Sequence, residues 1–401
     1  MKKKVVLAFS GGLDTSYCAL YLAKEKGLEV HTITVNTGGF SSQEETALQN
    51  RARLLGAASH QTVNIETTYY ERCLRYLVYG NVLRNGTYPL SVSAERVFQA
   101  MAIAEYARNI GAHYIAHGST GAGNDQVRFD MIFHILAPEM EILTPVREQK
   151  LSREAEIAYL KAHGIELDWQ KTEYSVNQGL WGTSVGGKET LRSDLPLPEK
   201  AYPTPVSESA PRKITLHFAA GQFQGFDGQR FRHPVQAIKA LNELAAPYGI
   251  GRDIHVGDTI IGIKGRVGFE AAAPMLIIKA HQTLEKHVLT KWQIYWKDQL
   301  ANWYGMLLHE GQYLEPVMRD IEAFLENSQP LVTGNVFVRL HPYRFEILGI
   351  ESPNDLMDAE FASYGEINLQ WDGNDVKGFA KMLANQTRIF HAVQKKREKR
   401  S

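Results

Sequence analysis

A glycine-rich turn between a buried strand and a helix constrains the fold of this chain most strongly. Val5–Phe9 is an unbroken apolar run, which is typical of a strand buried on both faces of a parallel sheet. Ser10-Gly11-Gly12 follows this run, and a helical pattern then extends from Asp14 to Lys26 and ends at Gly27. This order predicts that the chain begins with a strand–turn–helix unit of an α/β fold.

Strands and helices continue to alternate through the first part of the chain. Alternation of this kind predicts a doubly wound parallel sheet, whose ligands bind at the carboxyl ends of the strands. Further strands are expected at 30–35, 60–65 and 114–117, and helices at 44–55, 94–110 and 152–163.

The pattern changes in the second half of the chain. Residues 185–212 contain Gly186-Gly187 and several prolines, and they are interpreted as a surface excursion or linker. The remainder predicts a mixed α+β domain and then a C-terminal helix. The expected domains are residues 1–168 for nucleotide binding, 169–372 for synthesis and multimerisation, and 373–401 as a helical arm with a basic tail. Expected elements of the second domain are a strand at 213–218, strands or hairpins at 260–263, 275–279 and 336–350, and a helix at 234–246.

Composition limits the class of protein. The 401 residues carry 44 Lys and Arg against 44 Asp and Glu, and this balance argues against a general nucleic-acid binder. Two cysteines, Cys18 and Cys73, are too few for a disulfide framework, so a reducing cytoplasm is expected. The apolar run after Lys2–Lys4 is about six residues long, too short for a signal peptide or a membrane span.

The segment Ser10 to Ser16 has the properties of a phosphate-binding loop. Gly11 and Gly12 allow close backbone approach, so that successive N–H groups form an anion nest. The following helix adds the positive end of its dipole, and Asp14 is explained if Mg²⁺ is shared with the phosphates. The segment is not a Walker A motif. The simpler alternative is a tight turn with Asp14 as helix N-cap.

A second motif lies between Ala116 and Phe129. Its glycines expose the backbone, and Thr120, Asn124, Asp125 and Arg128 supply polar groups, among them an arginine able to grip a carboxylate. The alternative is a polar loop in which Asn124-Asp125 caps the next helix.

The two motifs also carry a family resemblance. The sequence Ser-Gly-Gly-Leu-Asp-Thr-Ser at 10–16 resembles the signature of the N-type ATP pyrophosphatases. The stretch 116–129 is similar to the second signature of the argininosuccinate synthase family, and 174–184 and 349–356 resemble further blocks of that family. The resemblance implies an ATP-dependent ligase that joins citrulline and aspartate through a citrullyl-adenylate and releases AMP and pyrophosphate.

The resemblance also implies roles for residues that match the family motifs. Asp14 and Asp125 are expected to be catalytic, and the ligands are expected to be ATP with Mg²⁺, citrulline and aspartate, with no metal bound by protein residues alone. Expected ATP contacts are Ala8, Phe9, Ser10, Gly11, Gly12, Leu13, Asp14, Thr15, Ser16, Val35 and Gly118; citrulline contacts are Tyr88, Ser93, Asn124, Arg128, Ser175 and Ser184; aspartate contacts are Thr120, Asn124 and Asp125.

Three positions depart from the family pattern. Ala122 stands where the family often has lysine, and Gly257 and Phe269 stand where it has the glutamate and the tyrosine that bind citrulline. Asp258 or Glu270 could compensate. These changes indicate a divergent branch or a modified amino-acid substrate.

Two further side chains allow more than one interpretation. Cys18, on the helix after the phosphate loop, is interpreted as a small buried hydrophobe rather than as a nucleophile. His117, at the end of a strand, could act as an acid or base near the phosphates or could be structural.

The C-terminal segment predicts an oligomer. Val376, Phe379, Leu383, Phe390 and Val393 form a heptad seam, interrupted at the position of Gln386, and a basic tail at 395–400 follows. In the family such a helix embraces neighbouring subunits of a homotetramer; the alternative is a helix folded onto its own domain. Rival functions are another adenylating pyrophosphatase, such as a tRNA-thiolating enzyme, and a catalytically inactive nucleotide sensor.

Overall fold

The protein consists of two compact units, residues 1–354 and 355–401. The structure is a computed structural model that describes residues 2–121, 123–166, 174–357 and 370–400. The departure at Ala122 therefore lies outside the described residues. None of the described helices is long and apolar enough to cross a lipid bilayer.

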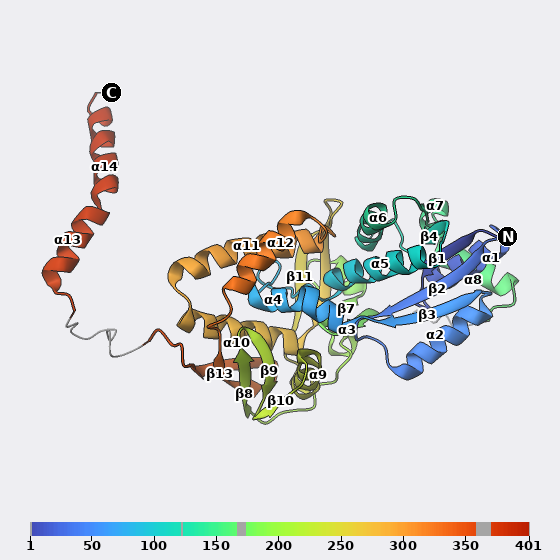
Figure 1. Ribbon diagram of the computed structural model, residues 1–401, viewed down its shortest axis with the longest axis horizontal. Helices are drawn as coiled ribbons and strands as arrows, with labels where there is room; N and C mark the ends of the chain where they lie inside the picture. The colour runs from blue at the N-terminus through green and yellow to red at the C-terminus, as the bar shows by residue number, and fades with distance from the viewer. Residues whose placement is uncertain (1, 122, 167–173, 358–369, 401) are drawn as a thin grey trace. The chain divides into compact units, whose positions relative to one another are not determined.

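The N-terminal part of the larger unit contains a five-stranded parallel sheet (Figure 1). Its order is β3-β2-β1-β4-β5, and every neighbouring pair is parallel. Because strand side chains alternate, Val6 faces the core under α5, whereas Val5 and Leu7 face the core under α1. The strands are β1 Lys4–Ala8, β2 Glu29–Asn36, β3 Ser59–Asn64, β4 Tyr114–Ala116 and β5 Glu141–Leu143.

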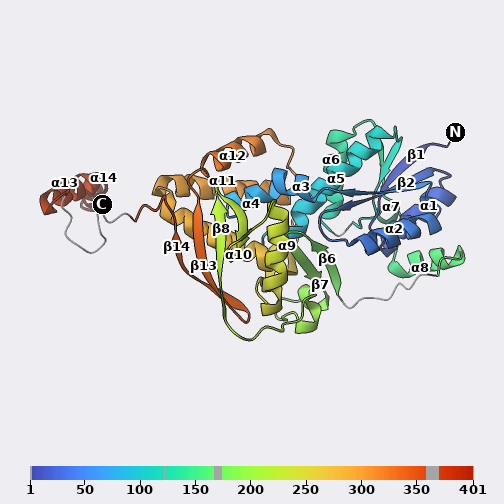
Figure 2. The same ribbon diagram turned by 60° about the horizontal axis from the view of Figure 1, so that its bottom comes forward.

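Helices cover both faces of this sheet, as expected for a doubly wound fold (Figure 2). Helices α5 and α6 pack together on one face, and α1, α2 and α8 lie on the other. The expected α/β class is confirmed. The helices are α1 Leu13–Lys24, α2 Ser42–Leu54, α3 Glu66–Tyr69, the π-helical η1 Tyr70–Leu74, α4 Arg75–Tyr79, α5 Ser91–Asn109, α6 Asp125–Leu136, α7 Pro145–Gln149 and α8 Arg153–Ala162.

Two antiparallel sheets follow in the sequence. One has the order β11-β12-β7-β6 and the other β10-β9-β8-β13-β14. The strands are β6 Ser175–Gly179, β7 Gly182–Gly186, β8 Arg212–Ala219, β9 Gln222–Phe226, β10 Gln229–Arg230, β11 Arg252–Asp258, β12 Lys264–Glu270, β13 Gly334–His341 and β14 Arg344–Glu351.

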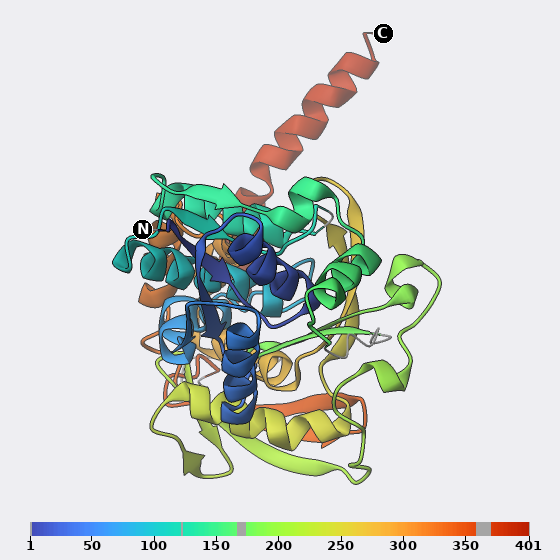
Figure 3. The same ribbon diagram turned by 90° about the vertical axis from the view of Figure 1, so that its right-hand side faces the viewer.

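Helices pack against these sheets and complete a mixed α+β region. Helix α9 lies along the second sheet (Figure 3), and α10 contacts β8, β13 and β14. The excursion at 185–212 contains two 3₁₀ turns, η2 Lys188–Leu191 and η3 Glu199–Ala201. The helices are α9 Pro234–Ala245, the 3₁₀ turn η4 Ala246–Tyr248, α10 Ala272–Val288, α11 Lys291–His309 and α12 Pro316–Asn327.

One of the strand-or-hairpin predictions in this region is wrong, and another falls on the turn of a hairpin. Residues 260–263 form the turn between β11 and β12, where Gly262 has a φ of +83°. Residues 275–279 lie inside α10, whose buried side chains recur with helical spacing at Leu276, Ile277, Ala280 and Leu284. A short apolar run does not distinguish a buried helix from a strand, and here the helix is 17 residues long.

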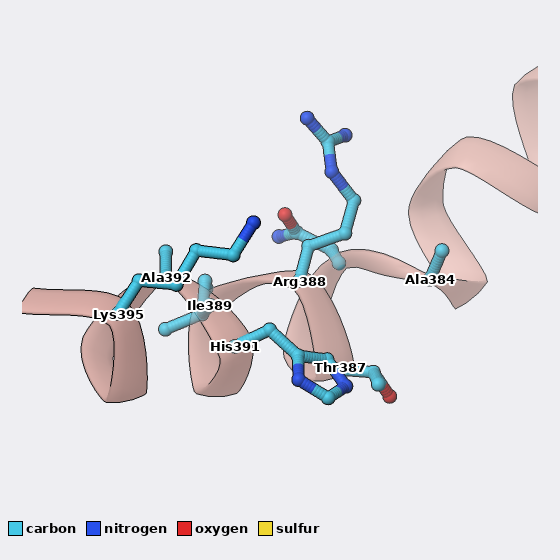
Figure 4. Close-up of a pocket in the computed structure, with 8 residues that line it drawn as sticks. Ala384, Thr387, Arg388, Ile389, His391, Ala392 and Lys395 are labelled. Atoms are coloured by element: carbon cyan, nitrogen blue, oxygen red, sulfur yellow. The ribbon is translucent and has the colours of Figure 1, made fainter. Parts of the chain in front are cut away.

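The C-terminal unit contains two helices, α13 Gly373–Leu383 and α14 Asn385–Glu398, joined at Ala384. Neither helix has a buried residue, and the apolar side chains of the predicted seam are exposed. A shallow hollow runs along α14 and is lined by residues of that helix and by Ala384. The side chains of Arg388 and Lys395 project from the helix (Figure 4). One helix cannot close around a ligand, so we place the functional site elsewhere.

Candidate active site

The turn after β1 is built as an anion-binding loop. Gly11 has a φ of +71°, which favours glycine, and its carbonyl accepts a hydrogen bond from the Arg51 guanidinium. The N-cap of α1 is Gly12, so the alternative in which Asp14 caps the helix is wrong. The Ser10 and Thr15 hydroxyls lie 3.3 Å apart beside the loop. The first N–H groups of α1 have no intrahelical acceptor and are available to a phosphate.

Asp14 shares its surroundings with a second carboxyl group. Helix α8 packs on α1 and brings Glu156, which is 2% exposed, within hydrogen-bond reach of Asp14. Burial and then the neighbouring Asp14 charge raise the pKa of Glu156 well above its usual range. Two carboxyls this close favour either a shared proton or a cation between them.

A cavity of about 630 Å³ opens at the carboxyl ends of β1, β2 and β4. Its volume suits a nucleotide-sized ligand. Of the predicted ATP contacts it is lined by Ala8, Phe9, Ser10, Gly12, Leu13, Asp14, Thr15, Val35 and Gly118, and of the predicted aspartate contacts by Thr120 and Asp125. Gly11, Ser16 and Asn124 are not among its lining residues, and none of the predicted citrulline contacts lines it.

The second motif lies directly against the phosphate loop. A Cβ atom on Gly118 would stand 3.1 Å from the Thr15 backbone nitrogen, so a glycine permits this close approach. His117 is held at both ring nitrogens: Nε2 lies 2.9 Å from Asp130 Oδ1, and Nδ1 accepts from the Ser119 N–H at 3.2 Å. These two contacts orient the imidazole ring and the start of the loop.

Asp125 is held between two arginines. Its Oδ2 accepts from Arg96 Nε at 3.1 Å, and its Oδ1 accepts from Arg128 Nη1 at 2.8 Å. Burial alone would raise the pKa of Asp125, but Arg96 and Arg128 hold it below its usual value. Asn124, the N-cap residue of α6, makes no side-chain cap; its Oδ1 accepts from the Ile260 N–H at the tip of the β11–β12 hairpin.

Three of the predicted citrulline contacts form a buried cluster next to Asp125. Arg128 Nη2 donates to Ser93 Oγ at 3.2 Å, and Arg128 Nε donates to the His309 carbonyl at 2.9 Å. Ser93 Oγ also lies 3.1 Å from His309 Nδ1. The Tyr88 hydroxyl bonds to Ser91 and to the Val92 N–H. His309, at the end of α11, completes this cluster from a distant part of the chain.

Two more of the predicted citrulline contacts lie on the β6–β7 hairpin. Ser175 is exposed at the start of β6, and Ser184 is buried on β7 between Asn177 of β6 and Phe269 of β12. Asn177 lines the cavity and accepts from Arg96 Nη2 at 3.2 Å. The hairpin therefore joins the network of Asp125 through Asn177.

Two positions of the β11–β12 hairpin, Gly257 and Phe269, depart from the family pattern, and aromatic rings occupy the space at both. A Cβ atom on Gly257 would stand 2.6 Å from His255 Nε2, so the histidine occupies that space. Phe269 packs against Tyr88, with ring centroids 5.5 Å apart. The possible substitutes are engaged elsewhere: Asp258 pairs with Lys264 at 2.6 Å, and Glu270 pairs with Arg252 at 3.0 Å.

Several residues of the site are not indicated by the sequence, among them four that line the cavity and His309 of the buried cluster. Thr37, Glu95, Gln99 and Asn177 line the cavity; Asn177 lies in the block 174–184 that resembles the family, and the other three belong to no recognised motif. Glu95 and Gln99 carry a partial signal, because Glu95 adjoins Arg96 in the sequence and Gln99 lies one turn further along the same helix. No local signal marked His309.

Comparison with known proteins places the chain in a family. Residues 4–166 match the model of the arginosuccinate synthase N-terminal HUP domain, and residues 174–390 match that of the C-terminal domain. The chain is 37% identical to an argininosuccinate synthase of Xanthomonas campestris, covering 98% of this chain and 99% of the relative. It is 33% identical to the argininosuccinate synthase of Methanocaldococcus jannaschii, and the matched region covers 99% of this chain and 100% of the relative. The chain belongs to the argininosuccinate synthase family.

Proposed function

We propose that this enzyme converts ATP, citrulline and aspartate into argininosuccinate, AMP and pyrophosphate. One observation carries the proposal: a single cavity is lined both by the loop 10–15 and by Thr120 and Asp125 of the second motif. The first group of residues suits a polyphosphate, and the second suits an amino acid. Family membership gives the chemistry that joins them.

ATP is proposed to bind with its β- and γ-phosphates at Ser10 to Ser16 and its adenine beside Val35. The amides of the loop, the dipole of α1 and the hydroxyls of Ser10 and Thr15 would stabilise the charge of the departing pyrophosphate. Mg²⁺ fits here because carboxylate oxygens are ligands that it prefers. Asp14 would bind the Mg²⁺ ion, and Glu156 lies next to Asp14. The ion would neutralise part of the negative charge of the phosphates.

Citrulline and aspartate are proposed to meet beside Asp125. Thr120, Asn124 and Asp125 would hold aspartate, and Asp125 would attract its ammonium group. Citrulline would lie toward the cluster on the other side of Asp125, with Tyr88, Ser93, Asn124, Arg128, Ser175 and Ser184 as its contacts. Holding three substrates in line supplies much of the rate, since alignment alone can lower a barrier by ~7–11 kcal/mol.

We expect pyrophosphate and AMP to form in quantity only when citrulline and aspartate are both present with ATP. The measurement is pyrophosphate release with each amino acid alone and with both, followed by replacement of aspartate with glutamate, asparagine or ornithine. If another amine replaced aspartate with higher kcat/KM, the roles given to Thr120 and Asp125 would be wrong. Release of no pyrophosphate under any condition would favour the inactive nucleotide sensor.

A tRNA-thiolating function is not supported by the cysteines. Cys18 and Cys73 are free and buried, and burial raises the pKa of each thiol, which disfavours the nucleophilic thiolate. A reducing location is consistent with two free thiols, and we infer a cytoplasmic enzyme.

We also propose that the chain is divided into three domains. They are a nucleotide-binding domain at residues 1–168, a domain for synthesis and multimerisation at 169–372, and a helical arm with a basic tail at 373–401.

We infer that the enzyme is a homotetramer bound together by its C-terminal arm. Residues of α13 and α14 expose seven large apolar side chains, and apolar surface of this extent marks an interaction site. They are Val376, Phe379, Met382, Leu383, Ile389, Phe390 and Val393.

Removing residues 374–401 is expected to lower the mass of the particle in solution. The apolar faces of the arm would no longer bury surface between subunits. Light scattering coupled to size-exclusion chromatography measures the mass, and the substitution of exposed Lys377 and Lys381 by alanine is a control that leaves the apolar seam in place. An unchanged mass after deletion would exclude the arm as the oligomer contact.

A further inference from the structure

Glu95 is a buried carboxyl in the wall of the cavity for which the reaction above has no role. It lies in the first turns of α5, is 2% exposed and lines the cavity beside Arg96 and Asn177. Among the described residues its Oε1 has no hydrogen-bond partner, and Thr37 donates to the carboxyl group. Glu95 therefore has one fully buried acceptor atom that no other described group uses.

The surroundings of Glu95 favour a carboxyl that gains and loses a proton. Burial raises the pKa of Glu95 to about 8, against the opposing charge of Arg96. Arg96 directs its hydrogen bonds to Asp125, Gln99 and Asn177 rather than to Glu95. The other titratable groups that act on Glu95 are Asp125, Tyr69 and Tyr88, and none of them is a cation.

The other acidic and histidine side chains that line the cavity are already committed. The Glu44 carboxylate accepts from the backbone and hydroxyl of Ser41 in a capping box, and its pKa is lowered. Asp125 is held by two arginines, and Asp14 belongs to the phosphate loop beside Glu156. Both nitrogens of His117 are bonded.

The second half of the proposed reaction requires a base. The α-amino group of aspartate is an ammonium ion near neutral pH and has no lone pair with which to attack carbon. Asp125, whose pKa is low, can bind this ammonium but is a poor proton acceptor. A carboxylate that has a higher pKa and lies in the same cavity is better matched to the task.

We propose that Glu95 is the general base that takes a proton from the ammonium group of aspartate before it attacks the citrullyl-adenylate. The amine nitrogen then forms its bond to the ureido carbon while the bond from that carbon to the oxygen of AMP breaks. The second proton of the former ammonium leaves as the guanidinium forms and goes to the phosphate of AMP. This role rests on the proposed function and adds the residue that activates its nucleophile.

Gly179 of β6 provides the space that Glu95 occupies. A Cβ atom at this position would stand 1.5 Å from Glu95 Oε1, so any side chain there must displace the carboxyl group. Gly179 thus gives a second way to disturb Glu95, by moving the carboxyl without removing it.

The test separates the two half-reactions. Citrulline-dependent exchange of labelled pyrophosphate into ATP reports adenylation without aspartate, and rapid-quench formation of argininosuccinate reports the second step. We expect Glu95→Gln to slow the second step by about 10²-fold, the lower range for general bases, while exchange stays within about threefold of the wild type. Gly179→Ala should slow the same step, and Glu105→Gln, exposed on the same helix, should change neither.

The pH profile gives a readout that a structural role would not change. Because only the carboxylate accepts a proton, the rate of the second step should rise with pH through about 8 in the wild type, and Glu95→Gln should lose this rise. An unchanged second step in Glu95→Gln, or an equal loss in both steps, would overturn the role of Glu95. Absence of exchange in the wild type would overturn the proposed function and this role with it.

Discussion

Replacing Asp14 by alanine is expected to lower pyrophosphate release by at least about 10²–10³-fold while the fold stays intact, which is the scale for losing one preorganised electrostatic contact to a transition state. Asp14 lies in the first turn of α1 and lines the cavity next to the loop. It is not the N-cap, so its removal does not uncap the helix. Its loss removes the carboxylate proposed to hold Mg²⁺ against the phosphates.

A matched substitution separates this effect from a general loss of charge. Asp320→Ala removes an exposed carboxylate on α12 and should leave turnover and the melting temperature near those of the wild type. Pyrophosphate release and thermal unfolding are measured for both variants. Near-normal turnover of Asp14→Ala would disprove the assignment of the loop, and a large fall in melting temperature would indicate damage to the fold instead.

Asp125→Ala is expected to remove activity and also to destabilise the protein. The carboxylate forms ion pairs with both Arg96 and Arg128, and Arg128 is only 3% exposed. Removal of one partner of a buried ion pair costs 3–5 kcal/mol, and because Asp125 faces the cavity we expect about 2 kcal/mol here. Aspartate would in addition lose the group proposed to attract its ammonium.

Asp125→Asn distinguishes the two consequences. The amide oxygen still accepts one hydrogen bond, so part of the stability should return, whereas activity should not, because the negative charge is absent. Denaturant unfolding and aspartate-dependent argininosuccinate formation are the measurements. If both variants had wild-type KM for aspartate and wild-type stability, the network of Arg96, Asp125 and Arg128 would have neither proposed role.

The sequence was sufficient for features encoded locally. The buried strand, the Ser-Gly-Gly turn and the following helix lie within 25 residues, and the structure has them as β1, the loop and α1. Local patterns failed where two structures have the same signal. The short apolar run at 275–279 fits a strand as well as a buried helix, and the structure has it inside α10.

Long-range partners of the site could not be predicted. His309 reaches Arg128 across 181 positions, and nothing near it in the sequence indicates the contact. Gly257 could be recognised as a lost carboxylate, but only the fold shows His255 in its place. Glu95 follows the same rule, because burial raises its pKa, and Gly179 of β6, 84 positions away, lies against its carboxyl group.

The central claim is that this cavity forms a citrullyl-adenylate. The most direct test supplies citrulline labelled with ¹⁸O in the ureido group, together with ATP and aspartate, and analyses the products by mass spectrometry. The ureido oxygen attacks the α-phosphorus and departs with AMP, so we expect one ¹⁸O atom in AMP and none in pyrophosphate or argininosuccinate. Unlabelled AMP formed alongside argininosuccinate would contradict it.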